Sequence, residues 1–291
     1  MFASLAVAAA TAGGCAYLDV KQREWIFRAQ REVHATPADH GLPHEDLWLT
    51  VKGAGPADER VHGWWIPAAG ADAPTLLYLH GSRWSLSNNL FRIARLRGMG
   101  FSVLAIDYRG FGKSDGELPS EAQVYADAQA AWEHLRRREP DPTRRFVYGH
   151  SLGGAVAIEL ATRNDDIAGL IIESTFTSMR DMATAMGYGG LPIGAVLTQH
   201  FDSLDKVARL AAPVLFVHGT SDRFVPAAMS EQLYAAAREP KRLLLVENAG
   251  HSNVTYVALD RYAAAVRDFL GLAGRAAATG RSRSAAAGHP G

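Results

Sequence analysis

Short, continuously apolar segments alternate with segments of helical periodicity along most of this chain. An apolar run without polar breaks is typical of a strand that is covered on both faces of its sheet. Such runs occupy 75–79, 101–106, 167–172 and 213–217, and further strands are predicted at 145–148 and 241–247. Helical periodicity is found at 85–98, 120–138, 155–161, 227–238 and 254–270. This alternation predicts an α/β fold with a mostly parallel central sheet and helices on both faces.

Two further strands are predicted before this alternation begins. The segments 46–51 and 61–66 flank the turn-rich stretch 53–56, as in an antiparallel hairpin. We therefore expect one domain that extends over residues 17–270.

The segment 174–206 interrupts the alternation of strands and helices, and we expect it to form a small lid over the site. It is rich in methionine, a side chain that adapts to varied apolar ligands. Met179 and Met182 are therefore candidates for the lining of a substrate pocket. The alternative is that these methionines fill gaps in the core.

The first 16 residues are apolar and small, and they are too few to cross a bilayer comfortably as a helix. They resemble a bacterial secretory signal that ends in a lipoprotein cleavage box, Gly13-Gly14-Cys15. This resemblance implies a lipid-anchored protein of the bacterial cell envelope, with the lipid on Cys15. However, no Lys or Arg precedes the apolar region, and Ala12 stands where such signals prefer Leu. An ordinary or uncleaved signal and an N-terminal extension of a cytosolic enzyme are the alternatives.

Two more terminal segments complete the predicted organisation. Residues 18–30 are expected to form an amphipathic helix that packs on the domain or, alternatively, rests on a membrane surface. Residues 271–291 consist mainly of Ala, Gly, Arg and Ser, and this composition predicts a disordered tail.

Composition narrows the possible partners. The 291 residues carry a formal net charge of +0, which gives no electrostatic reason to expect nucleic acid. A lone cysteine excludes an intramolecular disulfide, and no Cys/His cluster has metal-ligand spacing. We expect neither a metal nor another cofactor, and nothing in the pattern indicates the oligomeric state.

The sequence Gly149-His150-Ser151-Leu152-Gly153 lies between a predicted strand and a predicted helix. A serine on such a sharp turn is lifted clear of the sheet, and the two glycines allow the tight backbone around it. Ser151 is therefore the candidate nucleophile.

A serine hydroxyl needs an imidazole to accept its proton, and the imidazole needs a carboxylate to orient it. Asp222 and His251 each follow a predicted strand, and the chain order Ser…Asp…His is the order associated with this turn. Parallel strands could bring Ser151, Asp222 and His251 to one edge of the sheet. By contrast, we expect His80, His218, Asp107 and Arg109 to hold their own loops.

With these motifs, residues 45–270 resemble an α/β-hydrolase of the esterase and serine-peptidase-like branch. The motifs are His80-Gly81-Ser82, Asp107-Tyr108-Arg109-Gly110, the segment 149–154, His218-Gly219-x-x-Asp222 and Gly250-His251. The resemblance implies an acyl-enzyme intermediate and an oxyanion hole made by the backbone N–H groups of Leu152 and Ser82. Arg83 and Trp84 follow the oxyanion loop and are candidates for the substrate pocket.

The sequence thus predicts a serine hydrolase that cleaves a small-molecule carboxylic ester or thioester. A serine peptidase or amidase would use the same residues, so it stays an alternative within the enzyme class. A non-catalytic binding protein of the same fold is the alternative outside it.

Overall fold

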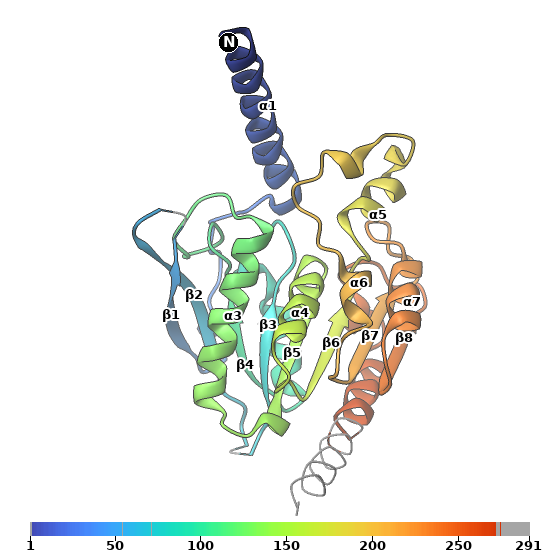
Figure 1. Ribbon diagram of the computed structural model, residues 1–291. Coiled ribbons are helices and arrows are strands. Elements are labelled where there is room, and N and C mark those ends of the chain that lie inside the picture. Colours follow the sequence, from blue (N-terminus) through green and yellow to red (C-terminus); the bar gives the residue numbers. More distant parts are fainter. Residues whose placement is uncertain (1, 54, 71, 272–273, 275–291) are drawn as a thin grey trace, which may run out of the picture.

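In the computed structural model, which describes residues 2–53, 55–70, 72–271 and 274, an eight-stranded sheet runs through the centre of the chain (Figure 1). Its strands are β1 (Glu45–Lys52), β2 (Asp58–Ile66), β3 (Thr75–Leu79), β4 (Ser102–Ile106), β5 (Arg145–His150), β6 (Gly169–Glu173), β7 (Val214–Gly219) and β8 (Lys241–Val246). They lie in the order β1-β2-β4-β3-β5-β6-β7-β8. β2 pairs antiparallel with β1 and β4, whereas all other pairs are parallel. The predicted mostly parallel sheet with a hairpin at one edge is confirmed.

Side chains that alternate along the central strands enter two separate cores. In β3, Leu77 and Leu79 pack on one face, and Leu76 and Tyr78 pack on the other. Because both faces are buried, this strand has the continuous apolar sequence from which it was predicted.

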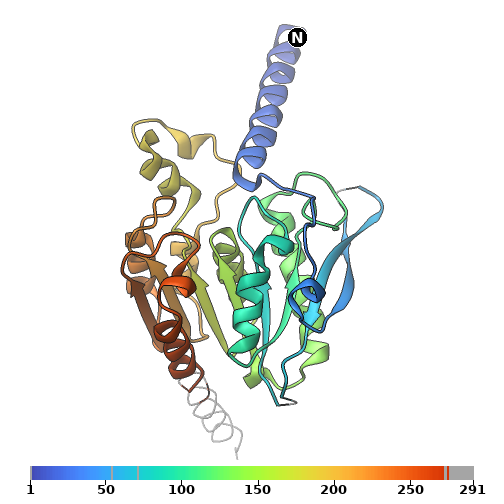
Figure 2. The ribbon, with the colours of Figure 1, turned by 180° about the vertical axis from the view of Figure 1, so that it is seen from behind.

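Helices cover both faces of the sheet, as Figures 1 and 2 show from opposite sides. One face carries α3 (Glu121–Arg138), α4 (Leu152–Arg163) and α7 (Ala227–Ala236), and the other carries α2 (Leu90–Gly98) and the helical residues 259–271. Short helices occur at α8 (Val254–Val257), Pro37–His40, Leu86–Asn89 and Pro142–Arg144. The last helix was expected to be continuous over 254–270, but it is interrupted at Ala258, where φ is −141°.

The N-terminal helix α1 (Phe2–Phe27) projects from the end of the sheet at which the carboxyl ends of the parallel strands lie (Figure 1). The helix expected at 18–30 therefore begins much earlier and ends at Phe27. Its end is fixed because the Phe27 carbonyl accepts a hydrogen bond from the backbone N–H of Arg83 (2.8 Å), and Arg28 has a left-handed φ of 47°. Ile26 and Phe27 are buried against the domain.

Among the described residues, no helix combines the length and the apolar character that crossing a bilayer requires. Cys15 lies exposed on α1, and its lipidation stays a prediction. The tail predicted at 271–291 lies outside the described residues, apart from 271 and 274.

The segment between β6 and β7 contains α5 (Met179–Ala183), a π-helical turn (Thr184–Tyr188), a 3₁₀ turn (Ile193–Ala195) and α6 (Ser203–Val207). The part before α6 rises above the carboxyl ends of the parallel strands, beside α1, whereas α6 lies against α4 and α7 (Figure 1). Gln22 of α1 donates to the carbonyl of Val196 (2.8 Å), which links the segment to α1. We call residues 174–206 the insertion.

Ser151 occupies a sharp turn between β5 and α4, with φ 53° and ψ −121°. This conformation is costly for a residue with a side chain, so the surroundings must enforce it. The N–H of Ser151 donates to the carbonyl of Glu173 (2.9 Å), and its carbonyl accepts from the hydroxyl of Thr175 (2.7 Å). The end of β6 therefore holds the turn.

Two glycines make room for this turn. A Cβ atom on Gly153 would lie 2.1 Å from the carbonyl oxygen of Leu79, and one on Gly149 would lie 2.3 Å from that of Gly153. Both neighbours are backbone atoms, which cannot move without disturbing β3 or α4.

The Gly153→Ala variant should therefore lose about 1–3 kcal/mol or more of unfolding free energy through overpacking at the turn. Gly190→Ala is the matched control, because nothing lies within 4 Å of the added methyl group and the glycine has no left-handed φ. Urea unfolding of both variants measures the difference. Equal midpoints for the two variants would contradict the account of the turn.

Candidate active site

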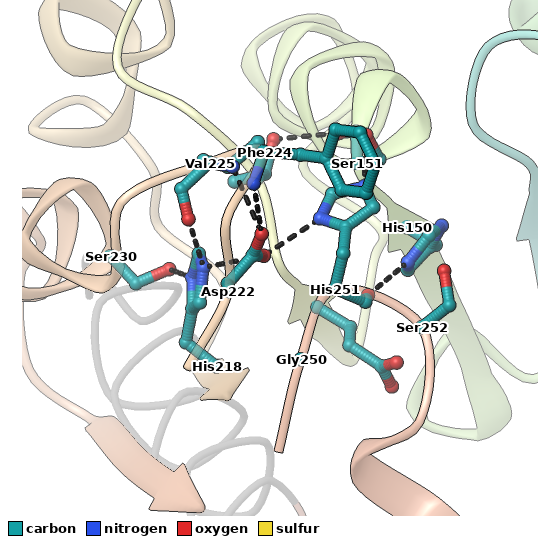
Figure 3. Close-up of polar contacts among 12 residues, drawn as sticks. His150, Ser151, His218, Asp222, Phe224, Val225, Ser230, Gly250, His251 and Ser252 are labelled. Atoms are coloured by element: carbon teal, nitrogen blue, oxygen red, sulfur yellow. Dashed lines mark hydrogen bonds and ion pairs between the residues drawn. The ribbon is translucent and has the colours of Figure 1, made fainter. Parts of the chain in front are cut away.

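The three predicted triad residues lie within hydrogen-bond distance of one another, although they are far apart in the sequence. His251 Nε2 is 3.0 Å from Ser151 Oγ, and His251 Nδ1 is 2.7 Å from Asp222 Oδ2 (Figure 3). A carboxylate can only accept, so Nδ1–H donates to Asp222, and Nε2 is left to accept the serine proton. The candidate triad thus has the geometry that nucleophile activation requires.

The side chain of Asp222 is fully buried, and each of its oxygens accepts two hydrogen bonds. The backbone N–H groups of Phe224 and Val225 donate to Oδ1 (2.8 and 3.0 Å), and His218 and His251 donate to Oδ2. Burial by itself would raise the pKa of Asp222, but the hydrogen bonds from His218 and His251 outweigh it and place the pKa below its usual value. The carboxyl group therefore stays ionised beneath the imidazole.

His218 was expected to hold its own loop, and it also supports Asp222. Its Nε2 lies 3.1 Å from Asp222 Oδ2, and its Nδ1 lies 2.7 Å from the hydroxyl of Ser230 (Figure 3). Since the carboxylate accepts from Nε2–H, Nδ1 must accept from Ser230. The spacing of four residues between His218 and Asp222 was visible in the sequence, but nothing there indicated this contact.

Two buried side chains, His150 and Arg92, bind carbonyl groups of the loop that carries His251. His150 Nε2 is 2.9 Å from the carbonyl of His251, and Arg92 donates to the carbonyl of Ser252 (3.1 Å). Burial first, and then the neighbouring Arg92 charge, lower the pKa of His150, so its ring is neutral and donates one N–H to the loop.

Arg92 itself is held by Glu173 at the end of β6. The guanidinium Nε lies 3.5 Å from Glu173 Oε1, with exposures of 4% and 1% for the two side chains. The hydroxyl of Tyr148 donates to the other oxygen of Glu173 (3.0 Å). The sequence did not indicate this role of Arg92, because α2 carries three arginines and arginines in an amphipathic helix normally face solvent.

The loop after β3 presents a candidate oxyanion donor. His80 Nδ1 lies 2.6 Å from the carbonyl oxygen of Gly81 and donates to it. In a trans peptide the N–H of the next residue points the opposite way, so this bond turns the N–H of Ser82 away from His80. Within the described part of the chain, the N–H groups of Ser82 and Leu152 donate to no other protein group, and both residues line one cavity with Ser151.

A buried acid lies on the other side of His80. His80 Nε2 is 3.6 Å from Asp107 Oδ1, and both side chains are buried. Burial raises the pKa of Asp107 to about 7 and lowers the pKa of His80 to about 4. Asp107 also accepts the N–H of Leu86 (2.8 Å), while Arg109 pairs with Asp127 (2.6 Å); neither Asp107 nor Arg109 lines the cavity.

A cavity of about 190 Å³ opens above Ser151. The four predicted pocket residues, Arg83, Trp84, Met179 and Met182, all line it. The lining also includes residues that sequence reasoning did not select: Trp25, Ile26, Arg28, Phe176, Met186 and Phe224. Trp25 and Ile26 belong to the end of α1 and Arg28 directly follows it, and the sequence did not reveal that this segment docks at the cavity. Among the described residues, no group of three His, Cys, Asp or Glu side chains could hold a metal ion.

The chain is 34% identical to the alpha/beta hydrolase domain-containing protein WAV2 of Arabidopsis thaliana, over 71% of this chain and 71% of the relative, and it therefore belongs to the α/β-hydrolase superfamily and is a hydrolase. A family model described as "Serine aminopeptidase, S33" matches residues 72–201. The chain is 41% identical to the uncharacterized protein Rv2307c of Mycobacterium tuberculosis over 196 residues, which cover 67% of this chain and 69% of the relative. It is 35% identical to protein bem46 of Schizosaccharomyces pombe, over 74% of this chain and 73% of the relative.

Solved structures share the fold at lower sequence identity. The esterase Pf2001 of Pyrococcus furiosus superposes with a TM-score of 0.69 at 21% identity, covering 84% of this chain and 97% of the esterase. An acylaminoacyl peptidase of Pyrococcus horikoshii gives a TM-score of 0.56 at 16% identity, covering 78% of this chain and 41% of the peptidase. Likeness at this level shows the α/β-hydrolase fold and no more.

The Arg92→Met variant should lose about 3–5 kcal/mol of unfolding free energy, because it leaves Glu173 buried without its cation. The Arg92→Met/Glu173→Gln double variant should regain part of that loss, since it removes the unpaired charge as well. A double-mutant cycle by urea unfolding measures the coupling. If the losses of the two single variants simply add up, the two side chains do not form the buried pair described here.

Asp107 and His80 predict a dependence of stability on pH. Because the folded protein holds the Asp107 proton to a higher pH than the unfolded chain, Asp107 lowers stability as the pH rises from about 4 to about 7. His80 has the opposite sign: its pKa is lowered, so it raises stability between about 4 and 6.5.

The Asp107→Asn variant removes only the first contribution. The variant should therefore become more stable relative to wild type as the pH rises from about 4 to about 7, which means that its free energy of unfolding increases relative to that of wild type. Urea unfolding at several pH values in this range measures the difference. A difference that does not change with pH would contradict the raised pKa of Asp107.

Proposed function

We propose that this protein is a serine hydrolase that cleaves a carboxylic ester or thioester through an acyl-enzyme on Ser151. The observation that carries the proposal is the continuous line of hydrogen bonds from Asp222 through His251 to Ser151, at 2.7 and 3.0 Å. His251 is 16% exposed, so its ring borders both the buried carboxylate and the cavity.

The chemistry follows from these positions. Ser151 Oγ attacks the carbonyl carbon while its proton passes to His251 Nε2, and Asp222 stabilises the imidazolium. The negative charge that develops on the carbonyl oxygen is placed at the N–H groups of Ser82 and Leu152. The imidazolium then protonates the leaving alcohol or thiol, and water attacks the acyl-enzyme by the same steps in reverse.

The charges of the cavity favour an ester over an aminopeptidase substrate. A free α-ammonium group needs a carboxylate partner, but the described lining residues include no Asp or Glu. They include arginines instead, which would repel an ammonium group. The matching family model is named for a serine aminopeptidase, so peptide cleavage remains the second candidate and is tested directly below.

A fluorophosphonate probe should label the wild-type protein and leave Ser151→Ala unlabelled, because the probe reacts with an activated serine. Ser221→Ala is the matched control: this exposed serine precedes Asp222 but is not among the residues that line the cavity. Mass spectrometry of the labelled peptide identifies the site. Labelling of Ser151→Ala at the wild-type rate would contradict the proposal.

The Asp222→Asn variant should lower kcat by about 10⁴-fold, because the amide leaves His251 in the wrong tautomer. Turnover of p-nitrophenyl esters measures this loss, and the same assay compares esters with aminoacyl p-nitroanilides. Wild-type protein should prefer the esters. Faster turnover of the anilides would replace the esterase proposal by the peptidase.

A further inference from the structure

The charge of the cavity lining is one-sided. Three arginines, Arg28, Arg83 and Arg92, line the cavity, and none of its described lining residues is a carboxylic acid. Arg92 is neutralised by its ion pair with Glu173 beneath the cavity. Arg28 and Arg83 form no ion pair with any described carboxylate, so the cavity carries two uncompensated positive charges.

Both of these arginines lie over aromatic side chains that also line the cavity. The guanidinium of Arg28 lies over the ring of Trp25, 6.0 Å from its centroid, and that of Arg83 lies over Phe224 at 5.9 Å. A cation–π contact uses none of the N–H donors of the guanidinium group, so these donors can still bind another partner. Apart from the bond of Arg28 Nε to the carbonyl of Trp25 (3.2 Å), neither guanidinium has a hydrogen bond within the described residues.

One backbone hydrogen bond holds the backbone segments that carry the two arginines side by side. The N–H of Arg83 donates to the carbonyl of Phe27, the residue directly before Arg28. Both arginines have a left-handed φ, 47° for Arg28 and 81° for Arg83, a conformation that is uncommon for residues other than glycine. The end of α1 and the oxyanion loop thus hold both arginines in unusual conformations beside the reacting serine.

Many of the other lining side chains are apolar. The insertion supplies four of them, Phe176, Met179, Met182 and Met186. A ligand that fills the cavity would therefore meet adaptable hydrocarbon and thioether surface from the insertion and two arginines beside the oxyanion loop.

We propose that Arg28 and Arg83 bind an anionic group, a phosphate or a carboxylate, of an amphiphilic ester whose hydrocarbon chain lies among the methionines of the insertion. This inference rests on the proposed function, and it names the substrate class for the same site. Arg83 is next to Ser82, so the anion would be bound close to the scissile carbonyl. Guanidinium groups suit this role because their paired N–H donors match the oxygens of both anions.

Matched substrates of equal chain length test the proposal. One arm compares 1-octanoylglycerol with 1-octanoylglycerol 3-phosphate, which places the anion on the alcohol. The other compares the p-nitrophenyl ester of octanoic acid with that of a dicarboxylic acid of the same length, which places the anion on the acyl group. The arm with the larger preference identifies the source of the anion.

For at least one anionic ester, kcat/KM should exceed that of its neutral partner by about 10-fold at low salt, and this preference should fall as salt is added. Arg83→Gln and Arg28→Gln should each reduce the preference, mainly through KM. Arg223→Gln is the matched control, because Arg223 is exposed in the loop after β7 but does not line the cavity. No preference in either arm, or a preference that survives both substitutions, would overturn the proposal.

A binding measurement separates this inference from the proposed function. Octyl phosphate, below its micellar concentration, should bind Ser151→Ala by calorimetry, and binding should weaken when Arg83→Gln is added. If the wild-type protein hydrolyses no ester but still binds octyl phosphate through Arg83, the proposed function fails and the anion site stands. If esters are hydrolysed but neither arm shows a preference for the anionic ester and octyl phosphate does not bind, the anion site fails alone.

Discussion

The backbone turn at Ser151 is the constraint on which the rest of the site depends. A serine at φ 53° is stable only because β6 fixes the peptide groups on both sides and because glycines stand where Cβ atoms would collide with backbone. The turn places Ser151 Oγ at the edge of the sheet where β7 and β8 also end. Since parallel strands end at the same edge, the loops that carry Asp222 and His251 reach the serine without any special connection.

A second layer of polar groups holds these loops in place. His218 and two backbone N–H groups orient Asp222, while His150 and Arg92 bind the carbonyls of His251 and Ser252. This layer is buried, so each of its hydrogen bonds lies in an environment where leaving a group unpaired is costly. Burying the charges of Arg92 and Glu173 costs free energy, but the buried Arg92 then fixes the position of the loop that carries His251.

Much of the fold could be predicted from the sequence because periodicity reports burial directly. The apolar run at 75–79 predicted the strand β3, and the pattern Gly149-His150-Ser151-Leu152-Gly153 predicted the turn before α4. The order of strands, with β4 between β2 and β3, could not be predicted, because it depends on pairings between distant residues. The extent of α1 was also missed, since its end is set by a hydrogen bond from Arg83 rather than by a local stop signal.

The residues of the candidate site can also be divided into those that the sequence indicates and those that only the folded structure brings to the site. Ser151, Asp222 and His251 belong to short motifs at strand ends, so the sequence could indicate them. Trp25, Arg28 and Arg92 reach the cavity only through tertiary packing, and no motif marks them. His80 was assigned to its loop, but its bond to the Gly81 carbonyl also sets the direction of the Ser82 N–H.

The central claim is that a nucleophilic serine and an oxyanion site meet in this cavity, and a crystal structure of the phosphonylated protein tests it most directly. A phosphonate that has reacted with the protein mimics the tetrahedral intermediate. We expect phosphorus bonded to Ser151 Oγ, with the phosphonyl oxygen within hydrogen-bond distance of the N–H groups of Ser82 and Leu152. Phosphorus on another residue, or an oxygen that points away from both N–H groups, would contradict it.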